Sequence, residues 1–390
     1  MRGALLGVPW LLAAQTVARW PIAVQVADAG GQYAVSFALL AIAGGAGIAL
    51  RRRDARVLVA PALVAALWLG YGAARLARFD AGGGARVAVG VVQASVPQAE
   101  RFQPGSAVRN VARHERATRA LVAEAPIDLV VWSETAVDID LDDTPGLVRQ
   151  LARLADEVGA PIVTGAPRTK DGRHTNAVVL FAPGAGLAES YDKQRLVPFS
   201  EYDPPGFGWL AKLIPDVVKG DPYVPGTTAT IFGAAPLPLA APVCFEITDA
   251  ALVRRFRAAG AALLVNVSND AWFGPGGYPQ MHFDHAIFRA VETRSAVVRG
   301  ANTGISGVVD AAGRVVATIP AFEEGVLRAE VTAAGAPPLY ARTGDAPLAL
   351  ALTAALGGLA AARMRRRAAP ASRPRRSGSA SRPAARGRAR

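Results

Sequence analysis

Four stretches of the chain are apolar and free of charged residues, and each is 16 to 18 residues long. A helix that crosses a bilayer needs about 20 such residues, and neighbouring Gly, Ala, Tyr and Trp residues could extend these stretches to that length. We expect the last three to be transmembrane helices. For the first stretch, a signal peptide is the alternative, although Arg2 is the only basic residue before it and no cleavage site stands out. The stretches are residues 3–18, 34–50, 57–74 and 346–362.

Basic residues at two places predict the orientation of these helices. Arg51, Arg52, Arg53 and Arg56 lie between the second and third stretches, and an arginine-rich segment follows the fourth. Basic loops remain on the cytoplasmic side of a membrane, so both groups are expected there. The third helix then carries the chain across the membrane, and residues 81–345 are predicted to be extracytoplasmic.

The formal net charge of +12 is concentrated in the carboxyl-terminal tail, residues 363–390. The tail contains eleven arginines and no acidic residue, which leaves 32 basic and 31 acidic residues, about +1, in the rest of the chain. Its Arg-, Pro-, Ala- and Ser-rich composition predicts a disordered cytoplasmic extension, although such a tail could also bind nucleic acid. The predicted organisation is thus a membrane segment (1–80), a globular domain (81–345), a final transmembrane helix (346–362) and this tail.

Within residues 81–345, short apolar runs alternate with amphipathic helical patterns. This alternation predicts an α/β fold with layers of strands and helices. The two sequences Asp171-Gly172 and the neighbourhood of Gly313 are typical of hairpin turns. Strands are predicted at 87–93, 127–132, 161–165, 177–182, 227–232, 237–243 and 262–267, and helices at 108–123, 147–158, 250–259 and 282–298.

Cys244 is the only cysteine, so the chain can form no internal disulfide. It follows the apolar run 237–243 and precedes Thr248 and Asp249, which are good N-cap residues for the helix predicted at 250–259. Helix N-terminal N–H groups favour thiolate over thiol, which would activate the sulfur. Taken alone, however, a single cysteine is more often a small buried hydrophobic side chain.

Other polar residues also follow predicted strands directly. Glu134 follows the run 127–132, and Asn269 follows the run 262–267. Lys193, one of four lysines, comes shortly after the run 177–182. Functional sites of open α/β sheets gather where strands end, so we expect these side chains to meet Cys244 in one crevice. A carboxylate, an ammonium group and a thiol together are suited to acyl transfer.

Three motifs that occur in order along the chain resemble a known signature. They are Val-Trp-Ser-Glu-Thr-Ala at Glu134, Tyr-Asp-Lys ending at Lys193, and Pro-Val-Cys-Phe-Glu at Cys244. They resemble the Glu–Lys–Cys signature of the nitrilase (carbon–nitrogen hydrolase) superfamily. The more specific likeness is to the apolipoprotein N-acyltransferase family. It rests on Leu-Val-Pro-Phe-Ser-Glu-Tyr (196–202), Asn-Val-Ser-Asn-Asp-Ala-Trp-Phe-Gly (266–274) and Arg-Gly-Ala-Asn-Thr-Gly-Ile-Ser (299–306).

The resemblance implies a nitrilase-like αββα sandwich attached to transmembrane helices. It also implies a reaction in which an acyl chain passes from a phospholipid of the phosphatidylethanolamine type, through a cysteine thioester, to the α-amino group of a lipoprotein's diacylglyceryl-cysteine. Glu134 would be the general base, Cys244 the nucleophile and Lys193 the group that stabilises the tetrahedral intermediate. The implied supporting or substrate-binding residues are Glu201, Phe245, Glu246, Asn269 and Trp272. No metal or cofactor and no nucleic acid is required, and we expect a monomer in the bacterial inner membrane.

The sequence departs from the family pattern most at its amino terminus. The resemblance begins within the family's membrane bundle, so either the start is misassigned or this is a shortened version. The apolar segment 199–224 is a candidate lid at the membrane surface, and a packed structural loop is the alternative. A membrane-anchored amidase or nitrilase, or a non-catalytic remnant, are the competing functions.

Overall fold

The computed structural model describes residues 11–80, 83–101, 103–134, 136–202 and 222–368. The chain divides into two compact units, Met1–Asp345 and Ala346–Arg390. The second unit contributes one described element, helix α11 (Ala346–Ala368). Much of the proposed lid and most of the arginine-rich tail lie outside the described residues.

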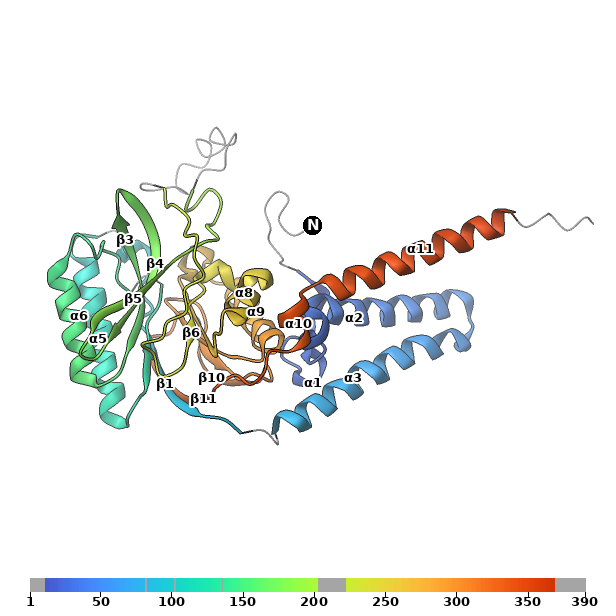
Figure 1. Cartoon of the computed structure of the whole chain (residues 1–390), viewed down its shortest axis with the longest axis horizontal. Helices are drawn as coiled ribbons and strands as arrows, with labels where there is room; N and C mark the ends of the chain where they lie inside the picture. Colours follow the sequence, from blue (N-terminus) through green and yellow to red (C-terminus); the bar gives the residue numbers. More distant parts are fainter. Residues whose placement is uncertain (1–10, 81–82, 102, 135, 203–221, 369–390) are drawn as a thin grey trace, which may run out of the picture. The chain divides into compact units, whose positions relative to one another are not determined.

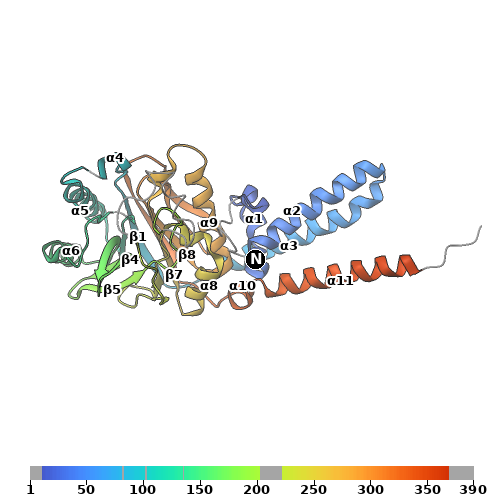
Figure 2. The same cartoon turned by 90° about the horizontal axis from the view of Figure 1, so that it is seen from above.

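The first unit contains two sheets that form an αββα sandwich (Figure 1). Helices α5 and α6 cover the six-stranded sheet, whose order is β11-β1-β2-β3-β4-β5, and α8 and α9 lie on the side of the five-stranded sheet, β10-β9-β8-β7-β6 (Figures 1 and 2). The sandwich strands are β1 (Arg86–Gln93), β2 (Leu129–Val131), β3 (Ile162–Lys170), β4 (Arg173–Ala182), β5 (Gly186–Asp192), β6 (Leu239–Ala240), β7 (Leu263–Ser268), β8 (Ala296–Ala301), β9 (Ser306–Val309), β10 (Val315–Ile319) and β11 (Gly325–Thr332). Its main helices are α5 (Ser106–Glu124), α6 (Pro145–Val158), α8 (Ala250–Ala258) and α9 (Tyr278–Thr293), with a short α4 (Gln98–Arg101) before α5 and α10 (Leu339–Thr343) near the end of the unit. The predicted α/β class and αββα sandwich are confirmed.

Both predicted hairpin turns are present. Lys170 pairs with Arg173, so β3 and β4 are joined by a two-residue turn in which Asp171 and Gly172 both have positive φ, 52° and 69°. That geometry is the one a type I′ turn requires, and Asp-Gly satisfies it at low cost. The second turn places Gly313 between β9 and β10, where its N–H bonds to the Asp310 carbonyl at 2.9 Å.

One predicted boundary and one predicted strand are wrong. The helix expected over 282–298 ends at Thr293, where Arg294 adopts a left-handed conformation (φ 52°), and the chain continues as strand β8. The run 227–232 forms no strand except for one bridge between Phe232 and Leu239. Every residue of β8 is buried, and a short buried run has no periodicity that distinguishes a strand from a helix.

Three helices are long and apolar enough to cross a membrane, among the residues the structure describes: Ala27–Arg52, Ala55–Asp80 and Ala346–Met364. They correspond to the last three apolar stretches. The first two contain α2 (Ala27–Arg52) and α3 (Val59–Asp80), and only 22% and 11% of their apolar windows are buried within the protein. The stretch 3–18 does not form a span over its described part, because residues 13–17 form a 3-10 helix that is followed by the four-residue α1 (Pro21–Val24).

A buried ion cluster joins α2 and α3 to the sandwich. The Asp28 carboxylate of α2 accepts a hydrogen bond from Arg75 of α3 at 2.7 Å and from Arg294, just after α9, at 2.6 Å. Arg294 also donates to Gln25 Oε1 and to the Ala311 carbonyl. We call Asp28, Arg75 and Arg294 the anchor cluster, since it fixes the two apolar helices to the end of α9.

Candidate active site

Glu134 lies just after β2, where the chain turns away from the six-stranded sheet. The turn passes so close to β3 that a Cβ added at Gly165 would lie 2.0 Å from the Glu134 carbonyl oxygen. The side chain is 6% exposed, and its Oε2 accepts a hydrogen bond from the Asn269 N–H at 2.8 Å. Packing against β3 therefore fixes the Glu134 backbone, and the hydrogen bond from the end of β7 holds its carboxylate.

Lys193 follows β5 and lies between two carboxylates. Its Nζ is 3.2 Å from Glu134 Oε1 and 2.8 Å from Glu201 Oε1, and the side chain is 1% exposed. Asn176 of β4 donates to the same two oxygens, at 2.8 and 2.9 Å. Burial opposes the charged ammonium, but the two carboxylates outweigh it and hold the pKa of Lys193 well above its usual value. We call Glu134, Lys193 and Glu201 the site cluster.

Cys244 begins a short 3-10 helix (Cys244–Thr248) and has a positive φ of 48°. The residue is 8% exposed. Burial and the charge of Glu134 raise the pKa of the Cys244 thiol to about 12, although Lys193 lowers it. The expectation of a thiolate stabilised by a helix N-terminus is therefore wrong, because α8 starts six residues later and is capped by Asp249, and burial shifts the thiol pKa upward rather than downward.

Glu246 is buried beneath this turn and holds it together. Its carboxylate accepts hydrogen bonds from the Tyr191 hydroxyl at 2.9 Å and from the N–H groups of Gln194, Arg195 and Val243 at 2.7 to 2.9 Å. It thereby ties the segment after β5, which carries Lys193, to the segment that carries Cys244. These contacts give Glu246 a structural part in the site.

The other predicted residues differ in their placement. Asn269 is 2% exposed, and its buried Nδ2 has no hydrogen-bond partner among the described residues. Trp272 is 52% exposed, and Phe245 is partly buried. The structure thus brings Glu134, Lys193, Glu201 and Asn269 into one hydrogen-bonded group and leaves the Trp272 ring largely in the open.

Sequence reasoning missed a second buried group that contacts the nucleophile. His282 of α9 lies 3.2 Å from the Cys244 carbonyl oxygen through Nε2 and 2.9 Å from Asp270 Oδ1 through Nδ1. Arg299 of β8 donates to Asp270 Oδ2 at 2.8 Å. Asp270 and Arg299 lie in the motifs quoted above, but no local spacing indicates that they meet His282. Asn176 was missed for the same reason.

Cys244, Asp270 and His282 each place one potential metal-ligand atom within 4.8 Å of the others. Arg299 already neutralises Asp270, and the buried guanidinium would repel a divalent cation at this position. The chemistry of this group therefore does not fit a resident metal.

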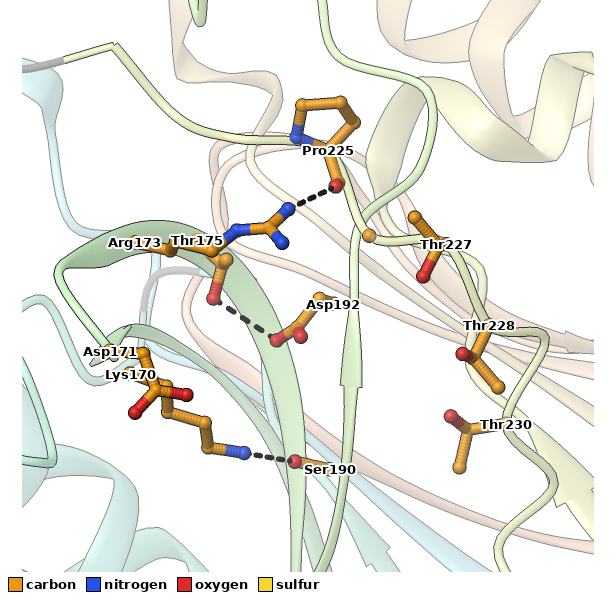
Figure 3. Close-up of a pocket in the computed structure, with 11 residues that line it drawn as sticks. Lys170, Asp171, Arg173, Thr175, Ser190, Asp192, Pro225, Thr227, Thr228 and Thr230 are labelled. Carbon is orange, nitrogen blue, oxygen red and sulfur yellow. Dashed lines mark hydrogen bonds between the residues drawn. The ribbon is translucent and has the colours of Figure 1, made fainter.

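A separate cavity of about 420 Å³ opens beside β4 and β5 (Figure 3). It is lined by polar side chains, among them Thr175 and Asp192, which are joined by a hydrogen bond of 3.0 Å. These residues directly precede Asn176 and Lys193, and successive side chains of a strand point to opposite faces. The cavity and the site cluster therefore lie on opposite sides of the same two strands, and none of the predicted site residues lines the cavity.

The chain is similar to known proteins in sequence and in fold. The carbon–nitrogen hydrolase family model matches residues 88–338. A protein of Geobacter metallireducens named apolipoprotein N-acyltransferase is 35% identical over 93% of this chain and 71% of its own length. One of the same name from Pseudomonas aeruginosa is 30% identical over 84% of this chain and 64% of its own length.

The solved structure of the Caenorhabditis elegans NitFhit protein superposes with a TM-score of 0.51 at 18% identity, covering 64% of this chain and 62% of that one. This likeness concerns the fold alone. The present chain spans about two thirds of the length of its curated relatives. Sequence identity, the matched family model and the sandwich together establish that the chain belongs to the apolipoprotein N-acyltransferase family of carbon–nitrogen hydrolases.

Proposed function

We propose that this chain transfers an acyl chain from a phospholipid to the amino terminus of a lipoprotein, with Cys244 as the covalent carrier. The observation that carries the proposal is the position of Lys193, which contacts both Glu134 and Glu201 and whose charge acts on the Cys244 thiol. The relatives' name supports the acyl-transfer reaction.

In the first half-reaction, Glu134 takes the proton of the Cys244 thiol as the sulfur attacks the ester carbonyl carbon of the phospholipid. This order follows from the raised thiol pKa of about 12, since a resting thiol needs a base at the moment of attack. Lys193 stabilises the oxyanion of the tetrahedral intermediate. When the carbon–oxygen bond breaks, Glu134 returns the proton to the lysophospholipid hydroxyl and a thioester remains.

In the second half-reaction, the α-amino group of a diacylglyceryl-cysteine attacks the thioester carbonyl. The amine proton passes to Glu134, the carbon–sulfur bond breaks, and the departing sulfur is reprotonated from Glu134. A thiolate leaves more readily than an alkoxide, so the thioester is a suitable relay between an ester and an amide. Glu201 and Asn176 hold Lys193 and Glu134 in place throughout.

Both substrates carry acyl chains, and each methylene withdrawn from the bilayer costs about 0.8 kcal/mol. Apolar helices α2, α3 and α11 would keep the site at the membrane and avoid that cost.

We place the sandwich on the extracytoplasmic face of a bacterial cytoplasmic membrane and the carboxyl-terminal tail in the cytoplasm, because basic segments remain on the cytoplasmic side. Phosphatidylethanolamine as donor and a monomeric enzyme belong to the same proposal.

Intact-protein mass spectrometry tests it. Incubation of the purified chain with phosphatidylethanolamine vesicles should add the mass of one acyl group, and Cys244→Ala should abolish the addition. A synthetic diacylglyceryl lipopeptide should then remove the adduct and gain the same mass. Release of free fatty acid without lipopeptide acylation would instead indicate a hydrolase, and no adduct at all would contradict the proposal.

A further inference from the structure

The carbonyl group of Cys244 is held by side chains from two different elements. His282 of α9 approaches its oxygen through Nε2 at 3.2 Å, and Asn266 of β7 approaches it through Nδ2 at 3.4 Å. A carbonyl oxygen only accepts hydrogen bonds, so Nε2 of His282 carries a proton and donates it here. Asn266 also donates to the Pro242 carbonyl at 2.8 Å, which fixes the chain just before the nucleophile.

A single guanidinium, that of Arg299, orients both donors. It donates to Oδ1 of Asn266 and to Oδ2 of Asp270, and Oδ1 of Asp270 in turn lies 2.9 Å from His282 Nδ1. All four side chains are at most 1% exposed. Each is therefore held in one position, because a buried polar group that loses its partner is costly.

The backbone of Cys244 needs such support. A residue other than glycine with φ near +50° is strained by about 1–2 kcal/mol and persists only where its surroundings fix it. Rotation about the N–Cα bond of Cys244 would relieve the strain. That rotation moves the carbonyl group and the Cα–Cβ bond together, so it would also shift the sulfur relative to Glu134 and Lys193.

We propose that His282 is a positioning residue for the nucleophile, and that its Nε2–H bond to the Cys244 carbonyl keeps the sulfur aligned with Glu134. Arg299, Asp270 and Asn266 form the support through which it acts. The inference concerns the reactivity of the thiol and can be tested without acyl transfer, so it can stand or fall separately from the proposed function.

Cys244 is the only cysteine, so alkylation by iodoacetamide, followed by mass, reports on this one thiol. We expect His282→Met to slow alkylation of the folded full-length protein by about 10- to 100-fold at neutral pH, as for a reacting group displaced by about 1 Å. His282→Gln keeps an amide N–H that can reach the position of Nε2, and it should restore the rate to within a few fold. With phosphatidylethanolamine, kcat for formation of the acyl-enzyme should fall in parallel, with KM unchanged.

His285→Gln is the matched control. His285 lies one turn further along α9, is fully buried, and bonds to Gln15 at 2.8 Å rather than to the Cys244 turn. This variant should retain the wild-type alkylation rate even if its melting temperature falls.

A His282→Met protein that melts at a lower temperature but alkylates at the wild-type rate would overturn the proposal and leave His282 a purely structural residue. Equal impairment of His282→Gln and His282→Met would also contradict it. Should His282→Met fail to fold, Arg299→Lys supplies the same test. Lysine keeps a cation beside Asp270 but lacks the second N–H donor of the guanidinium, which orients Asn266. Wild-type alkylation in that variant would count against the support described here.

Discussion

The two buried ion clusters of this protein contain the same types of group in opposite proportion. The site cluster places one ammonium, Lys193, between the carboxylates of Glu134 and Glu201. The anchor cluster places one carboxylate, Asp28, between the guanidinium groups of Arg75 and Arg294. Counted as formal charges, the first cluster carries −1 and the second +1.

The difference follows from what each cluster does. Arginine presents several N–H donors in a rigid plane and is always charged, so it suits a fixed joint between helices. Lysine is a compact point charge, which suits the stabilisation of an oxyanion that forms at one position. Burial and the negative charge of Glu134 in the site cluster raise the pKa of Cys244, so the thiol needs a base when it attacks.

The largest effect should come from removing either charge that acts on the reaction. Glu134→Gln removes the base and Lys193→Met removes the cation that stabilises the oxyanion. Each should lower the rate of acyl-enzyme formation by about 10²–10⁴-fold. The measurement is the time course of the acyl adduct by mass spectrometry. Asp28→Asn alters only the anchor cluster and is the control. A comparable loss of rate in that variant would contradict the assignment of catalysis to the site cluster alone.

Asp28→Asn should instead reduce stability strongly. It leaves Arg294, which is 9% exposed, without a counter-charge, and loss of one partner of a buried ion pair costs about 3–5 kcal/mol. Arg75 is 29% exposed, so solvent offsets part of its loss. Thermal unfolding in detergent should show a clearly lower melting temperature, with the alkylation rate of Cys244 in the folded protein unchanged. An unchanged melting temperature would show that the cluster does not hold the helices to the sandwich.

Replacing arginine by lysine in the anchor cluster, and lysine by arginine in the site cluster, should have an intermediate effect. These variants keep the charge and change only the shape of the cationic group. Arg294→Lys keeps the charge but loses bonds to Gln25 and to the Ala311 carbonyl, at a cost of about 1–3 kcal/mol. Lys193→Arg also keeps the charge, yet it introduces a larger group at a position that is 1% exposed. We expect the first to lower the melting temperature with acyl transfer retained, and the second to abolish acyl transfer. The opposite pattern would refute the assignment of roles.

The smallest effect concerns pH. The pKa of Lys193 is raised by its carboxylates, so its contribution to stability is complete below the unfolded-chain value of about 10.4 and is lost as pH rises through the higher folded value. In Lys193→Met the two carboxylates face each other without a cation. The melting temperature of that variant should therefore rise as pH falls from 7 to 5, where the wild type lacks this gain. Parallel pH curves for the two proteins would contradict the predicted coupling.

Local sequence was sufficient for much of this description. Apolar length predicted the helices that contain α2, α3 and α11, and strand-like runs predicted β1 to β4, β6 and β7. The motifs around Glu134, Lys193 and Cys244 indicated the chemistry because each lies at the end of an element with a clear pattern. Such signals extend over a few neighbouring residues and need no knowledge of distant contacts.

Tertiary structure alone decided which distant groups share a site. Asn176 bridges Glu134 and Glu201, and Arg299 orients His282 through Asp270, although each lies in a different element. It also decided the upward direction of the Cys244 pKa shift, since the pKa of a thiol depends on the burial and charges that the whole fold arranges around it. Hydrophobic periodicity reports which face of an element is buried, whereas the partners of a buried polar group are fixed only when separate elements pack together.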